Sequence, residues 1–428
     1  MMRCIKEGKG VQGLLSGIIV SVGATILGIS VVQLANGYLG TLVSITAAAS
    51  GFPPLAMGIV LASYFGGYTL GAATLGSLLL RVGHVRLFAA LAGLVAACIA
   101  LQPVFTSPAA WVVIRLVTGM GCAGLFLTAE SWLNGSATAE NRGRVFSLYM
   151  VATNLAFGAG QFLINLPAPH GFELFSLAAA LFGLALMPVS LTQAQAPTVG
   201  RSPRLGIRAL RRLAPVAVAG CAAAGLMGST FYALIPAYAQ TQGIPASSIS
   251  AYIATAIFGG LAFQIPVGRL SDSFDRRLVA AGVAAGFAVC AVVLAMMPFG
   301  AWTMLPVTFL LGGFMSTVYP VCVAHANDRV LPEQVVSTSG SLILINGIAS
   351  FLGPILGTAI MGRVGVAGVF LYVAAVALLF VGLAMWRFVR VRRVRWKDRP
   401  FVPVDPSMGQ LAHVADDTEM PPGAVREG

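Results

Sequence analysis

The chain has 428 residues, of which 57% are hydrophobic and only 9% are charged, and it contains 50 glycines. Soluble domains have an apolar share of about 45–50% with glycine included, so this composition excludes a water-soluble protein and indicates a membrane protein. The formal net charge is +12, and in a membrane chain such an excess reports topology before it reports nucleic-acid binding.

Six membrane spans are predicted in the first part of the chain, because about 20 apolar residues suffice for one helical crossing. They lie at 13–38, 55–79, 87–106, 109–132, 145–166 and 172–192. A polar, basic stretch follows, and six more spans are predicted at 214–239, 248–269, 278–298, 302–325, 338–361 and 366–386. The sequence therefore predicts an all-α membrane protein of twelve transmembrane helices.

The expected domains follow from this pattern. They are an N-terminal segment (1–12), a six-helix bundle (13–192), a basic linker (193–213), a second six-helix bundle (214–386) and a tail (387–428) that is first basic and then polar and disordered. The basic start of the tail is either an anchor after the last span or a contact for anionic lipid headgroups.

Lysine and arginine are distributed very unevenly between the two sides of the predicted membrane segments. Of the 26, all but Arg115, inside a span, and Arg363, on the opposite side, fall on one side. The positive-inside rule then places both termini and the linker on the cytoplasmic side of the membrane, which we expect to be a bacterial inner (plasma) membrane.

The two halves repeat each other. "GSLLLRVGHVR" begins at Gly76 after the second span, and "GRLSDSFDRR" begins at Gly268, 192 residues later, after the eighth. Asn154, Gly158 and Gln161 share one face of the fifth span. The same offset gives three further residues in the eleventh span: Asn346, Ser350 and Gly353.

These features together resemble the major facilitator superfamily. Its loop motif, Gly-x-x-x-Asp-Arg-x-Gly-Arg-Arg, matches the second repeat better than the first, where Leu80 replaces the aspartate. The matching residues are Gly76, Arg81 and Gly83 in the first copy, and Gly268, Asp272, Arg276 and Arg277 in the second. A fourth-span motif, Arg-x-x-x-Gly-x-Gly, matches Arg115, Gly119 and Gly121, and "AESWLN" with "ENRGR" resembles a little-characterised bacterial branch of permeases. The resemblance implies two pseudo-symmetric six-helix bundles that work by alternating access.

The charged loops are interpreted as a cytoplasmic latch that favours the state closed to the cytoplasm, because carboxylates and arginines can pair across helix ends. Since Leu80 cannot accept a hydrogen bond, the first half needs another acid, and we expect Glu130 to face Arg81, Arg142 or Arg144. The alternative role for Glu130 is a proton carrier.

Polar residues inside the spans are candidates for a substrate cavity near the membrane midplane, although any one of them can instead tie helices together. Arg115 either contacts an anionic or polar substrate, couples a proton, or bonds to backbone carbonyls near the outer end of its span. The candidates are Gln33, Asn36, Arg115, Asn154, Gln161, Tyr232, Gln264, Tyr319 and Asn346.

The predicted function is secondary transport of a small organic solute, neutral or zwitterionic, with or without a coupled proton. The alternatives are a multidrug/proton efflux antiporter and, in another class, a transport-dead sensor or lipid-handling protein. No catalytic constellation, cofactor motif or metal-ligand spacing is found, so no enzyme is expected. The expected partners are the solute and membrane lipid, with no nucleic acid, and the protein is expected to be a monomer.

Overall fold

The computed structural model describes residues 2–137, 141–167, 171–190, 207–297, 302–331, 334–365 and 367–390. Side chains are described from residue 22 onward, apart from 207–209 and 336. Most of the predicted linker (193–206) and of the predicted tail (391–428) lies outside the described residues.

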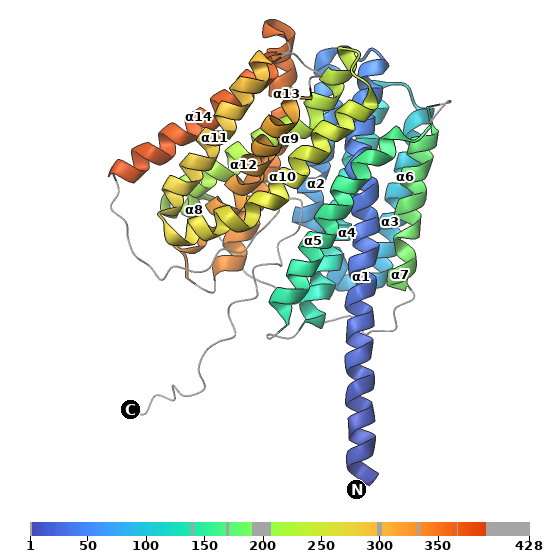
Figure 1. The fold of residues 1–428 in the computed structure, drawn as a ribbon. Helices are drawn as coiled ribbons and strands as arrows, with labels where there is room; N and C mark the ends of the chain where they lie inside the picture. Colours follow the sequence, from blue (N-terminus) through green and yellow to red (C-terminus); the bar gives the residue numbers. More distant parts are fainter. Residues whose placement is uncertain are drawn as a thin grey trace.

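The described chain consists of helices, arranged as two groups side by side in Figure 1. The first group contains α1 (Met2–Ala49), α2 (Pro54–Val82), α3 (His84–Leu101), η1 (Gln102–Val104), α4 (Pro108–Ser136), α5 (Arg142–Gly160), η2 (Gln161–Asn165), α6 (Glu173–Leu184) and α7 (Leu186–Ser190). The second contains α8 (Ile207–Leu213), α9 (Pro215–Thr241), α10 (Ala246–Ser273), α11 (Arg276–Met296), α12 (Met304–Asn327), α13 (Val335–Val364) and α14 (Ala367–Arg390).

Within the described residues, 12 helical segments are long and apolar enough to cross a membrane, which confirms the predicted fold class. The largest difference in position concerns the first span, predicted at 13–38, because the apolar part of α1 continues to Ala49. The polar residues Gln33 and Asn36 face the interior of the molecule and do not mark the end of this helix. The chain turns only at Gly51, whose φ of +69° suits glycine, and α2 starts after Pro53.

Close helix packing is duplicated between the bundles. In the first bundle, a Cβ atom at Gly67 of α2 or at Gly119 of α4 would lie under 3.0 Å from the facing helix backbone. In the second, the same holds at Gly259 of α10 and Gly312 of α12. Gly259 follows Gly67 by the predicted offset of 192 residues. These glycines let paired helices approach until their backbones touch.

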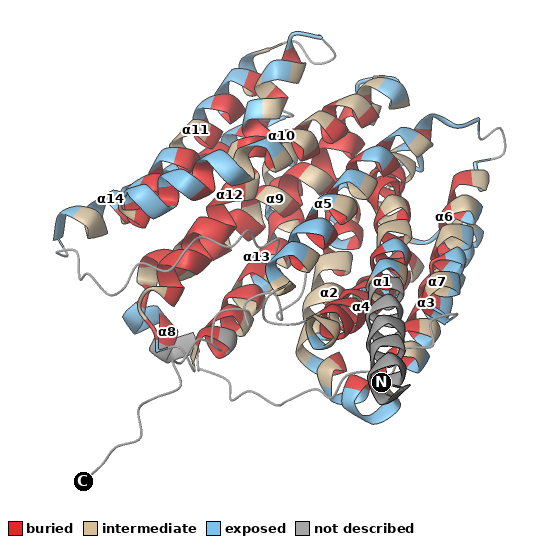
Figure 2. Ribbon diagram, turned by 60° about the horizontal axis from the view of Figure 1, so that its bottom comes forward, coloured by how far each residue is buried: buried red, intermediate tan, exposed pale blue. Residues whose placement is uncertain are grey.

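Burial follows the expected pattern for a protein surrounded by lipid. Figure 2 shows exposed residues on the outer faces of α11 and α14, whereas α12 is buried along most of its length. Large apolar side chains such as Val289 and Leu379 are among the exposed ones, at 64% and 76%. These faces suit contact with lipid chains.

The bundles meet at one end of the molecule. We call the end that contains Gly83, Ala137, Asn141, Phe274 and Asp328 the basic side, and the other end the opposite side. Ser44 Oγ of α1 donates a hydrogen bond to the Ala233 carbonyl of α9 at 2.8 Å, close to the opposite side. Asn165 and Ser250 also hydrogen-bond there, at 3.2 Å, and join η2 to α10.

Candidate functional site

A cavity of about 260 Å³ lies between the two bundles. Its lining comes from α1, α2, α4, α5 and η2 on one side and from α9, α10, α12 and α13 on the other. The structure brings together all the residues predicted from polarity alone: Gln33, Asn36, Arg115, Asn154, Gln161, Tyr232, Gln264, Tyr319 and Asn346.

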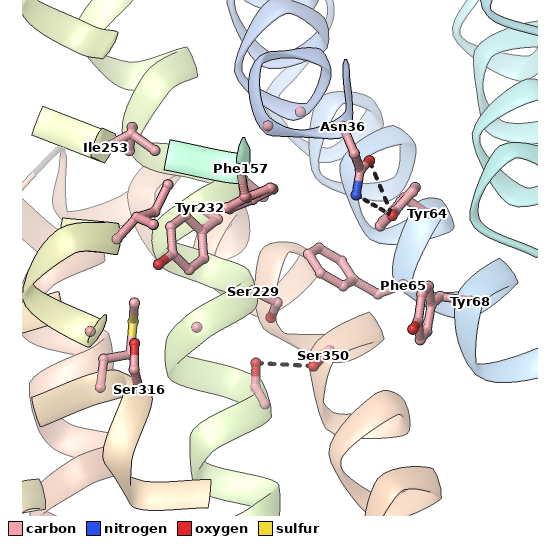
Figure 3. Close-up of a pocket in the computed structure, with 18 of the residues that line it drawn as sticks. Asn36, Tyr64, Phe65, Tyr68, Phe157, Ser229, Tyr232, Ile253, Ser316 and Ser350 are labelled. Atoms are coloured by element: carbon pink, nitrogen blue, oxygen red, sulfur yellow. Dashed lines mark hydrogen bonds between the residues drawn. The ribbon is translucent and has the colours of Figure 1, made fainter. Parts of the chain in front are cut away.

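The wall of the first bundle contains a connected polar group. Asn36 Nδ2 donates hydrogen bonds to Tyr64 Oη at 3.2 Å and to Gln33 Oε1 at 3.4 Å. The Asn36 and Tyr64 pair is visible in Figure 3, where both side chains border the cavity. The Tyr64 ring in turn lies under Arg115, whose Cζ is 4.5 Å from the ring centroid.

Among the described residues that line the cavity, Arg115 is the only one with a formally charged side chain. It is 4% exposed, and its Nε has no hydrogen-bond partner. One predicted alternative was that Arg115 bonds to backbone carbonyls. In the structure its Nε makes no such bond. The ring of Tyr64 is the described contact of this guanidinium.

Two of the predicted amides tie helices together. Gln161 accepts a hydrogen bond from Thr41 Oγ1 at 2.9 Å and donates one to the Gly37 carbonyl, which joins η2 to α1. Asn346 Nδ2 donates to the Cys221 carbonyl at 3.0 Å and joins α13 to α9. Both therefore have structural partners in addition to their place in the lining.

Of the aromatic part of the wall, the sequence predicted Tyr232 and Tyr319 but missed the remaining residues. In Figure 3, Phe65, Phe157 and Tyr232 project into the space between the bundles. Tyr64 and Tyr68, four residues apart on α2, also line the cavity, and this spacing in "SYFGGY" was the available signal. Small hydroxyl residues complete the lining, among them Ser229, whose Oγ is buried and has no partner.

The predicted latch residues lie on the basic side. In the second bundle, Arg276 forms ion pairs with Asp272 at 3.2 Å and with Asp328 at 2.7 Å. Arg277 pairs with Asp275 at 2.9 Å. Gly268 is buried one turn before Asp272 on the same helix. The described ion pairs of this cluster all join residues of the second bundle.

In the first bundle, Gly83 ends α2 with a φ of +85°, and its N–H donates to the Leu79 carbonyl at 2.9 Å. Glu130 is 0% exposed and accepts a hydrogen bond from Tyr149 Oη at 3.2 Å. The other predicted members of this group differ in burial. Arg81 and Arg144 are exposed, whereas Gly76 and Arg142 are half-buried.

Burial and hydrogen bonding act in opposite directions on the carboxyl group of the second loop. Although burial raises the pKa of Asp275, the hydrogen bonds and the charge of Arg277 outweigh that effect and hold the pKa of this carboxyl below its usual value. Asp275 also caps α11, since its side chain accepts the Arg277 N–H at 2.9 Å. The loop is thus fixed by one ionised carboxylate.

Comparison with known proteins gives consistent matches over most of the chain. The model of the Major Facilitator Superfamily matches residues 15–262 and, in an overlapping match, 218–416. The chain is 30% identical over 358 residues to the "Uncharacterized MFS-type transporter YcaD" of Salmonella enteritidis PT4, covering 83% of this chain and 92% of that protein. The protein of the same name from Escherichia fergusonii is 31% identical over 360 residues, with the same coverage.

Solved structures share the fold at low sequence identity. The nucleoside transporter NupG superposes with a TM-score of 0.69 at 14% identity, covering 87% of this chain and 100% of that one. A bacterial homologue of the human lysosomal transporter Spinster, solved in an inward-facing and unoccupied conformation, gives 0.70 at 15% identity, covering 88% and 99%.

Proposed function

Because the chain belongs to the Major Facilitator Superfamily and is a multi-pass membrane transporter, we propose that it moves a small organic solute across the bacterial inner membrane by alternating access. The observation that carries the proposal is the cavity between the bundles, lined from both of them by donors, acceptors and aromatic rings. A site at the interface of two repeats can be reached from either side when the bundles rock against each other.

The contacts between the bundles support a conformation open toward the basic side. Ser44 with Ala233, and Asn165 with Ser250, join the bundles near the opposite side. A Cβ atom at Gly58, near the start of α2, would also lie under 3.0 Å from Thr358 of α13. The described ion pairs of Arg276 join it to Asp272 and Asp328 of the second bundle. With the basic side assigned to the cytoplasm by its charge, this is the inward-open state.

Transport through this cavity can be tested by filling it. Gly228 lines the cavity, and a Cβ atom at this position meets nothing within 4 Å, so the side chain of Gly228→Trp can extend into the open space. Gly183 of α6 also has open space around its Cβ position but is exposed and lies outside the cavity lining, so Gly183→Trp is the matched control.

The experiment uses the full chain reconstituted in proteoliposomes. Solutes that raise the melting temperature of the purified protein in a thermal-shift screen are radiolabelled, and their counterflow is measured with and without a pH gradient. We expect Gly228→Trp to abolish counterflow and Gly183→Trp to leave it intact. Equal transport by both variants, or transport by neither the wild type nor the control, contradicts the proposal.

A further inference from the structure

We propose that the solute is an organic monoanion whose carboxylate binds to Arg115. This inference rests on the proposed transport function and names the substrate class of the same cavity. It starts from an imbalance of charge: Arg115 lines the cavity, and none of the other lining residues is an aspartate, glutamate, lysine or histidine.

The surroundings of Arg115 leave its charge without a counterion. The side chain is 4% exposed, its Nε has no hydrogen-bond partner, and no described ion pair includes it. The Tyr64 ring, 4.5 Å away, provides a cation–π contact, which neutralises no charge. A buried cation is costly unless it is paired, so a site of this kind favours an anion that brings its own negative charge.

A second arginine in the same protein shows what a completed buried site looks like. Arg276 is 5% exposed, close to the value for Arg115, but it pairs with Asp272 and Asp328 and donates to Ser271 Oγ at 3.2 Å. Two carboxylates thus neutralise Arg276 within the chain. At Arg115 the corresponding place is left for a ligand, and a carboxylate matches the planar fork of a guanidinium.

The rest of the cavity restricts the ligand further. An ammonium group would find no carboxylate in the lining, which disfavours cations and zwitterions relative to simple anions. Phe65, Phe157 and Tyr232 offer contact to an apolar or aromatic body. On the wall of the second bundle, the unpartnered Ser229 Oγ is available to a second polar group of the solute. The cavity of about 260 Å³ limits the ligand to a small molecule.

The test compares three probes of similar size but different charge, namely benzoate, benzamide and benzylammonium, on the purified full-length protein. We expect benzoate to raise the melting temperature and the two other probes to have little effect. In Arg115→Gln the affinity for benzoate should fall by about 10- to 100-fold, because one charge-assisted contact is lost, and Arg115→Lys should retain part of it.

The melting temperature of the ligand-free protein distinguishes a ligand-binding role for Arg115 from a structural one. If the arginine is an uncompensated charge, Arg115→Gln without ligand melts at or above the wild-type temperature. The proposal is overturned if benzamide stabilises as well as benzoate, if Arg115→Gln binds benzoate like the wild type, or if benzoate gives no stabilisation. A neutral or cationic solute whose counterflow is blocked by Gly228→Trp but unaffected by Arg115→Gln would overturn the anion site and leave the transport function standing.

Discussion

The two bundles of this transporter share their packing but differ in their charges. Gly67 and Gly119 bring α2 and α4 together in the first bundle, and Gly259 and Gly312 do the same for α10 and α12 in the second. Gly312 follows Gly119 by 193 residues, and at the same offset from Arg115 the second bundle has the uncharged Thr308. The helix frame has therefore been kept in both copies, whereas charged positions have diverged.

The charges of the two bundles also lie in different places. The first bundle carries Arg115, which has no described ion pair, in the central cavity and an uncharged Leu80 in the last turn of α2. The second bundle has no charge in the cavity lining and carries a paired cluster around Arg276 on the basic side. The two bundles thus share a helix scaffold but carry these charged groups at different depths.

The largest expected effect tests the shared packing. Gly119→Ala in the first bundle and Gly312→Ala in the second should each lower the free energy of unfolding by about 3 kcal/mol, because the new methyl group meets the backbone of the facing helix. Gly93→Ala and Gly282→Ala, where a Cβ meets nothing within 4 Å, are the controls and should have little effect. Thermal melting in detergent gives the comparison. If only one of the two substitutions lowered the stability, the glycine pairs of the two bundles would not be equivalent.

The paired cluster should respond to neutralisation in the opposite way to the cavity arginine. Asp328→Asn removes one of the two carboxylates of a buried guanidinium and should cost about 2 kcal/mol of stability, since Asp328 itself is 17% exposed. Arg115→Met removes a charge that has no carboxylate partner and should not destabilise the empty protein. Chemical unfolding of the two variants side by side measures both signs. A stabilised Asp328→Asn would refute the structural role of the cluster.

Transport should be more sensitive to the second loop than to the first. Asp272→Asn weakens the ion pair with Arg276, whereas Leu80→Asn changes an exposed residue with no charge to lose. We expect a several-fold slower counterflow for Asp272→Asn and a nearly wild-type rate for Leu80→Asn. Equal rates for the two variants would remove the asymmetry between the loop copies.

Glu130 provides a smaller test within the first bundle. It is fully buried and bonded to Tyr149, and Glu130→Gln keeps a hydrogen-bond acceptor while removing the charge. If Glu130 belongs to a latch, the variant shifts the balance of inward and outward states, measured by labelling of single cysteines, and still binds the solute. Loss of binding, or of pH-driven transport alone, would instead favour the proton-carrier alternative.

Much of the fold and of the cavity could be predicted because polarity is conspicuous in apolar helices. Polar residues such as Gln33 and Asn346 stand out in their spans, and all the chosen residues of this kind line the cavity. Tyr64 and Phe157 were missed because aromatic side chains occur both in the interior and on the exposed faces of this protein, so their type does not reveal their direction. The first span was also predicted to end near Gln33 and Asn36, whereas it continues to Ala49. Hydropathy alone cannot tell whether polar residues face a cavity or mark the end of a membrane span.

The same limit applies to ion pairs. The motif in the second loop predicted that its acids and arginines pair, but it did not predict the partners. Arg277 pairs with Asp275, whereas Arg276 pairs with Asp328, which lies 52 residues further along the chain. That choice depends on how α11 and α12 are packed, which is a tertiary property.

The smallest expected effect concerns the second loop alone, because the first has no carboxylate at its α2–α3 junction. The pKa of Asp275 is below its ordinary value of 3.8 because the hydrogen bonds and charge of Arg277 outweigh the effect of burial. A carboxyl with a depressed pKa in the folded state stabilises the protein above its unfolded pKa and loses this contribution as the pH falls through the folded value.

Asp275→Asn should therefore cost about 1 kcal/mol near pH 7, since the helix cap loses its charge but keeps an acceptor. Melting curves of wild type and variant should converge as the pH falls below about 3.8. A difference that stays constant well below that pH would show that the cap, and not the ionised pair with Arg277, accounts for the role of Asp275.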